Sequence, residues 1–136
     1  DPAASLKFEG DTGPYIQYAA ARIHSIERKA RERKIDFDAA SADWSLLGHE
    51  AEKALAVTAG FYPAVLRTAA ERRDCSGLAE YLLELAKAFN RFYRECPVLA
   101  AESEPLAAAR LAMADAVRAI LTDGLNTLTI RVPEAM

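Results

Sequence analysis

Two tyrosines and an arginine follow one another at helical spacing near the start of the chain: Tyr15, Tyr18 and Arg22. At about 100° per residue, these side chains share one strip of a helix, which continues through Ser25 to Lys29. Exposed rings can stack on unpaired bases, and a guanidinium can bind a phosphate or a base edge. The strip therefore predicts a surface that binds single-stranded RNA. The alternative is that the rings fill the edge of the core and the cations only solvate the helix.

Further side chains extend this candidate site. Gln17 can both donate and accept hydrogen bonds. Tyr93 lies at the edge of the apolar face of a helix expected over residues 76–96, and Asn90 lies about 60° farther round on its polar side. A core position is the alternative for Tyr93, whereas Gln17 and Asn90 can equally cap or bridge helices.

Positive charge is concentrated beside the aromatic strip. The chain has a net charge of −3, yet residues 22–34 hold six basic and two acidic side chains, a local balance of +4. Such a basic end can steer a polyanion to one place on an acidic body. We therefore expect Arg28, Lys29 and Arg31 to attract phosphates, although a charge run can also be a solvated helix end.

Residues for catalysis or metal binding do not converge in the sequence. His24 and His49 fall on different expected helices, and neither belongs to a triad or metalloprotease motif. Cys75 and Cys96 bracket one long helical pattern that would hold them roughly 30 Å apart, too far for a disulfide. The four residues also lack the short spacings of metal ligands. We expect no catalytic residue and no metal site.

Helical periodicity dominates the whole chain, which predicts an all-α fold. A length of 136 residues, half of them apolar, suits one domain with a proper core, residues 1–136. We expect a single compact bundle of about five helices: residues 12–34, 45–59, from 63 onward, 76–96 and 106–122. Gly124 is the expected C-cap of the last helix. Leu125, Leu128, Ile130 and Val132 should then pack a non-helical tail against the bundle.

Several motifs in order give the chain a family resemblance. They occupy residues 9–22 (Glu-Gly-Asp-Thr-Gly-Pro-Tyr-Ile-Gln-Tyr, running to Arg22), 61–65, 81–86, 89–99, 109–111 and 124–136. Together they resemble the carboxyl-terminal DALR anticodon-binding domain of arginyl-tRNA synthetases. The resemblance implies that Tyr18, Arg22, Tyr93 and the terminal Met136 line a pocket for the central cytosine of the anticodon.

The resemblance also implies a function and its partners. The domain would clasp the anticodon loop of arginine tRNA, and a catalytic domain elsewhere in a longer chain would ligate arginine with ATP and Mg²⁺. No cofactor is expected in this piece. No apolar run approaches the roughly 20 residues of a membrane span, so we expect a cytoplasmic location, and the start at Asp1 suggests a fragment. The alternatives are a stand-alone adaptor that binds tRNA or protein, and a generic bundle that packs against a partner helix.

Overall fold

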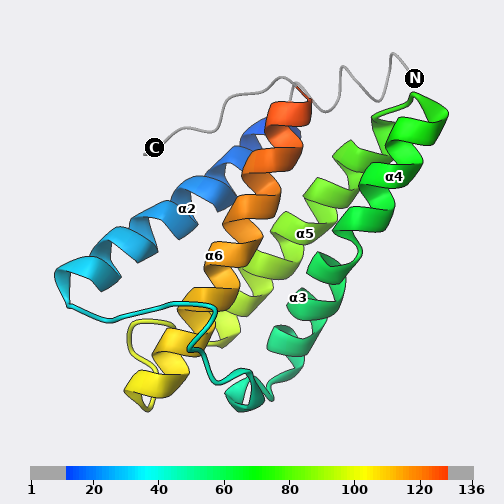
Figure 1. Ribbon diagram of the computed structural model, residues 1–136. Helices are drawn as coiled ribbons and strands as arrows, with labels where there is room; N and C mark the ends of the chain where they lie inside the picture. Colours follow the sequence, from blue (N-terminus) through cyan, green and yellow to red (C-terminus); the bar gives the residue numbers. More distant parts are fainter. Residues whose placement is uncertain (1–11, 129–136) are drawn as a thin grey trace.

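A computed structural model describes residues 12–128, and this part of the chain is helical without a strand (Figure 1). Its elements are α2 (Gly13–Glu32), the short 3₁₀ helix η2 (Trp44–Leu46), α3 (Glu50–Gly60), α4 (Tyr62–Arg72), α5 (Ser76–Glu95) and α6 (Glu104–Thr127). The all-α prediction is confirmed.

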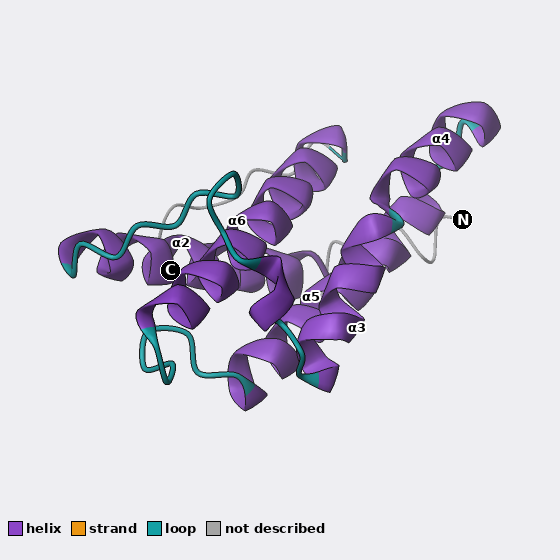
Figure 2. Cartoon of the chain, turned by 60° about the horizontal axis from the view of Figure 1, so that its bottom comes forward, coloured by secondary structure: helices purple, strands orange, loops and turns teal. Residues whose placement is uncertain are grey.

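The helices α5 and α6 pack against each other at the centre of the bundle. Helix α2 packs against both of them, while α3 and α4 pack against α5. In Figures 1 and 2, α3 and α4 follow each other end to end, on the side of α5 away from α2. The seam between α2 and α5 therefore lies apart from α4.

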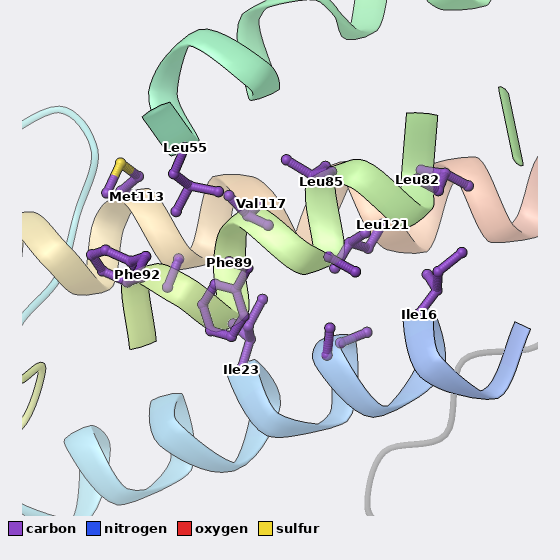
Figure 3. Close-up of a cluster of buried hydrophobic side chains, with 14 of the residues drawn as sticks. Ile16, Ile23, Leu55, Leu82, Leu85, Phe89, Phe92, Met113, Val117 and Leu121 are labelled. Carbon is purple, nitrogen blue, oxygen red and sulfur yellow. The ribbon is translucent and has the colours of Figure 1, made fainter. Parts of the chain in front are cut away.

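The core lies where the apolar faces of these helices meet (Figure 3). Helix α5 carries the most regular stripe, with Leu78, Leu82, Leu85, Phe89 and Phe92 at spacings of three and four residues and all fully buried. Burial of Phe89 and Phe92 agrees with their central position on the stripe. Burial of this stripe fixes the rotation of α5, and with it the side on which Asn90 and Tyr93 emerge.

The second helix starts later than its sequence pattern predicts. Residues 44–46 form η2, and the α-helix begins only at Glu50. The cause is a capping box: His49 Nδ1 accepts from Ala51 N at 3.0 Å, and Glu52 Oε1 accepts from His49 N at 2.8 Å. His49 is therefore the N-cap residue of α3. Leu46 lies in η2, ahead of the α-helix, and its side chain is exposed.

The last helix ends later than predicted. Gly124 is not a C-cap but an interior residue of α6, which continues to Thr127. A Cβ atom at Gly124 would lie 2.6 Å from Cδ2 of Leu82 on α5, so the glycine permits a close approach of the two helices. Leu125, expected in a non-helical tail, is buried within α6. Ile130 and Val132 lie outside the described residues.

Two buried carboxylates join α6 to its neighbours. Glu27 of α2 is fully buried, and its Oε2 lies 3.1 Å from Nε of Arg118. Glu52 of α3 pairs with Nε of Arg110 at 2.8 Å, and Nη1 of Arg110 also donates to the Pro97 carbonyl at 2.6 Å. Removing one member of such a pair leaves an uncompensated buried charge, so these bridges resist sliding of α2 and α3 along α6.

Candidate nucleic-acid interface

The candidate site begins with a preformed pair of side chains at the seam between α2 and α5. The guanidinium carbon of Arg22 lies 4.9 Å from the centroid of the Tyr93 ring. This cation–π contact holds a flat cationic group against an aromatic face, with both side chains exposed. Tyr93 is 41% exposed, so the core position considered for it is not adopted. The pair can present both a ring and a row of N–H donors to a ligand.

Asn90 ties this pair to the start of α2. Its Oδ1 accepts from Nη1 of Arg22 at 3.0 Å, and its Nδ2 donates to the hydroxyl of Tyr15 at 2.9 Å. Tyr15, Arg22, Asn90 and Tyr93 therefore form one connected group across two helices. The bridging alternative considered for Asn90 is the one observed.

Tyr18 lies beside this group and is more exposed. Its side chain is 60% exposed, compared with 38% for Tyr15. Tyr18, Arg22 and Tyr93 line an open hollow of about 300 Å³ at the surface. The remaining lining residues are Ala21, Ser25, Ile26, Arg28 and Lys29. The hollow thus combines two rings, cationic groups and a small apolar floor, which is the composition suited to an unstacked base and its phosphates.

The three predicted phosphate-attracting cations separate into two sets. Arg28 and Lys29 are exposed at the hollow, and Nη2 of Arg28 lies 3.4 Å from the Ser25 hydroxyl. Arg31 does not line it. Its guanidinium lies 3.9 Å from Glu27 Oε2 and 5.5 Å from the centroid of the Phe37 ring. Arg31 thus contacts a buried carboxylate and the segment after α2.

The two remaining predicted site residues are Gln17 and Met136. Gln17 is half-buried on α2 and, at 100° per residue, lies about 140° around the helix axis from Arg22. It is not among the residues that line the hollow. Met136 lies outside the described residues, so its predicted place beside Tyr18 and Tyr93 stays a prediction.

Glu27, one of the two acidic side chains within residues 22–34, is buried rather than part of the charged surface. Burial of its carboxyl raises its pKa to about 7, and a hydrogen bond with Asp115 also raises the pKa, against the lowering effect of Arg118. For Asp115, burial is outweighed by hydrogen bonds with Glu27 and Arg118, which lower its pKa. The apolar spacing of Ile16, Ala20, Ile23 and Ala30 includes position 27 and could have revealed this burial.

Within residues 12–128, no three His, Cys, Asp or Glu side chains come together to hold a metal ion. Cys75 and Cys96 are free thiols at opposite ends of α5. None of the helices between residues 12 and 128 is both long and apolar enough to cross a membrane.

Comparison with known proteins decides the family. The DALR anticodon binding domain family matches residues 16–136. The chain belongs to this family. It is 42% identical over 138 residues to an arginine–tRNA ligase of Treponema denticola, with all of this chain and 23% of that protein covered. It is also 42% identical over 132 residues to an arginine–tRNA ligase of Methanosarcina barkeri, covering 97% of this chain and 23% of that protein.

Solved structures of arginyl-tRNA synthetases also share the fold of this DALR domain. Thermus thermophilus arginyl-tRNA synthetase matches 95% of this chain with a TM-score of 0.82 and 40% identity, over 22% of its own length. A putative arginyl-tRNA synthetase from Campylobacter jejuni matches 90% of this chain with a TM-score of 0.75 and 27% identity, over 26% of its own length. The DALR domain described here therefore spans about a quarter of the length of these relatives and corresponds to their C-terminal part.

Proposed function

We propose that this DALR domain binds the anticodon loop of arginine tRNA through the hollow between α2 and α5. The observation that carries the proposal is the Arg22–Tyr93 pair, 4.9 Å apart, facing the same hollow as the exposed ring of Tyr18. The exposed ring of Tyr18 can stack on a splayed base, and the Arg22 guanidinium, which lies over the Tyr93 ring, offers a second flat face. Stacking on aromatic side chains and arginine planes is a general mode of single-strand recognition. The Arg22 guanidinium can at the same time donate to the polar edge of that base.

Positive charge at the hollow supports the same role. Arg28 and Lys29 line the hollow, and in this proposal they attract the phosphates on either side of a bound base. Arg31 is less suited to this task, because its guanidinium already contacts Glu27 and the Phe37 ring. Met136 keeps the role that the resemblance gives it, closing the pocket for the central cytosine of the anticodon.

The whole protein to which this domain would belong is proposed to be an arginine–tRNA ligase. This step rests on relatives that carry that name and are about four times longer than the matched region. ATP and Mg²⁺ would then act in the catalytic part, in the cytoplasm, and not in residues 1–136. The isolated chain is accordingly expected to show no arginine-dependent exchange of ATP and pyrophosphate above background.

The binding role is tested with the 136-residue chain and an arginine-tRNA anticodon stem-loop. Tyr18→Ala and Arg22→Ala should each weaken binding by about 1–3 kcal/mol, the scale of one lost stack or bidentate contact. The melting temperature should change little, since both side chains are exposed. Fluorescence anisotropy gives the affinities, and replacing the central cytosine of the stem-loop should cost the wild type a similar amount.

Arg67→Ala on α4 is the matched control, because it removes an exposed arginine from a helix that does not line the hollow. Its affinity for the stem-loop should stay within about twofold of that of the wild type, because the loss of one exposed charge far from the hollow has only a small effect. If Tyr18→Ala and Arg22→Ala fold normally and bind the stem-loop as well as the wild type does, the loop does not bind at this hollow and the proposal fails.

A further inference from the structure

The contacts of Asn90 differ from those of the residues that face the hollow. Asn90 and Tyr15 do not line it, whereas Arg22 and Tyr93 do. The Oδ1 atom of Asn90 accepts a hydrogen bond from Nη1 of Arg22 at 3.0 Å, and its Nδ2 atom donates one to the Tyr15 hydroxyl at 2.9 Å. The Asn90 amide thus links the Arg22 side chain, which lines the hollow, to Tyr15 near the start of α2, which does not.

The chemistry of the three partners fixes the direction of these hydrogen bonds. A guanidinium has donors only, so the amide oxygen must face Arg22 and the amide nitrogen must face the Tyr15 hydroxyl. That hydroxyl accepts from Asn90, which leaves its own proton free to point elsewhere. Reversal of the amide would place two donors against each other at Arg22. The network therefore has one favourable arrangement.

An arginine side chain has several rotatable bonds, and immobilising it on binding costs conformational entropy. Two contacts at different places on the Arg22 guanidinium restrict it before any ligand arrives: the hydrogen bond to Asn90 and the face of Tyr93. A group held in this way offers its remaining N–H donors to the hollow in a fixed plane. Such preorganisation increases affinity and base selectivity without a further contact to the ligand.

We propose that Asn90 is a positioning residue for base recognition, which acts by holding the Arg22 guanidinium against Tyr93 rather than by contacting RNA. Tyr15 supports it, because its hydroxyl anchors the other end of the same amide. The inference rests on the proposed binding of an anticodon loop at this hollow. It changes the roles expected for Asn90 and Tyr15 from contact with the RNA to control of a neighbouring side chain.

A double-mutant cycle on binding of the arginine-tRNA anticodon stem-loop tests this role. In the wild-type background, Asn90→Ala should weaken binding roughly tenfold, the scale for a hydrogen bond to a charged group. In the Arg22→Ala background, the same change should cost less than about twofold, because the group that Asn90 positions is gone. A residue that touches RNA directly would instead cost the same factor in both backgrounds.

Tyr15→Phe provides a second variant that keeps the ring and removes only the hydroxyl. It should produce a smaller loss than Asn90→Ala, and that loss should also disappear in the Arg22→Ala background. Thr68→Ala on α4 is the control for truncation of an exposed polar side chain away from the hollow, and it should change nothing. Circular dichroism melting of every variant separates loss of binding from loss of fold.

Selectivity gives a readout that a purely structural role would not change. Asn90→Ala should reduce the preference for the cytosine-centred stem-loop over one with another central base, while the melting temperature stays near that of the wild type. Equal losses in both Arg22 backgrounds, or no loss in either, would overturn the positioning role while the proposed function stands. A wild-type chain that does not bind the stem-loop would overturn both.

Discussion

At the scale of single residues, the arrangement of side chains around Arg22 could be predicted only in part. The helical spacing of Tyr15, Tyr18 and Arg22 placed them on one exposed strip, and the structure has them there. The hydrogen bonds of Asn90 could not be foreseen, because its two partners are 68 and 75 residues away in the sequence. Spacing within one helix says which side a residue faces but not which residue of another helix it meets.

Glu27 allows a prediction on pH dependence. Its pKa of about 7 in the folded state lies above the ordinary value of 4.5, so the folded protein binds this proton more tightly than the unfolded chain. The associated stabilisation is complete below about pH 4.5 and is lost as the pH rises through about 7. The stability of the wild type relative to Glu27→Gln should therefore fall by about 2 kcal/mol from pH 5 to pH 8.

Urea unfolding of both proteins at several pH values in this range measures the difference. Comparison with Glu27→Gln cancels the titration of the other groups of the protein, since both proteins contain them. A difference that stays constant, or that grows as the pH rises, would show that Arg118 keeps the Glu27 carboxylate ionised throughout.

At the scale of elements, the packing of α5 against α6 depends on Gly124. An alanine in a helix interior is favoured over glycine by about 1 kcal/mol, whereas overpacking a core costs about 1–3 kcal/mol. The new Cβ would lie 2.6 Å and 2.8 Å from the two terminal carbons of Leu82, which is fully buried. We expect Gly124→Ala to destabilise the domain by about 1 kcal/mol net.

The matched control is Gly77→Ala in α5, where a Cβ would meet nothing within 4 Å. This change should be neutral or stabilising by up to about 1 kcal/mol. In a Leu82→Ala background, Gly124→Ala should lose its cost, because the clashing carbons are gone. Chemical denaturation gives all the values, and an unchanged cost in that background would mean that the strain arises elsewhere.

The same glycine shows why some helix boundaries could not be predicted. A glycine near the end of a helical pattern is a common C-cap, and nothing local distinguishes it from a glycine that lets another helix approach. The decisive partner, Leu82, belongs to a different helix. The C-terminal boundary of α5 was predicted to within one residue, because Pro97 ends the helix through its own backbone chemistry. A helix boundary set by the backbone chemistry of one residue could be predicted, whereas a boundary that depends on packing against another helix could not.

At the scale of the whole molecule, an acidic chain carries a local basic surface. The net charge is −3 while residues 22–34 carry +4, so salt should weaken RNA binding only through the few cations at the hollow. For single strands, each neutralised phosphate contributes about −0.7 to the slope of log affinity against log salt. Lys29→Ala should reduce the magnitude of that slope by about 0.7.

Affinity measured across a salt series tests this, with Arg67→Ala on α4 as the control that should leave the slope unchanged. If both variants change the slope equally, attraction comes from the charge of the whole molecule and not from the hollow.

The end-to-end placement of α3 and α4 has a consequence for motion. Only Phe61 separates the two helices, and the Tyr81 hydroxyl donates to the carbonyls of Thr58 and Ala59 at 2.7 Å and 3.3 Å beside this break. Beyond it, Tyr62 is the one buried residue of α4. A helix with so little buried surface can detach while the others stay folded. Amide hydrogens of α4 should exchange with solvent much faster than those of α5, in a local opening that leaves the RNA-binding hollow intact.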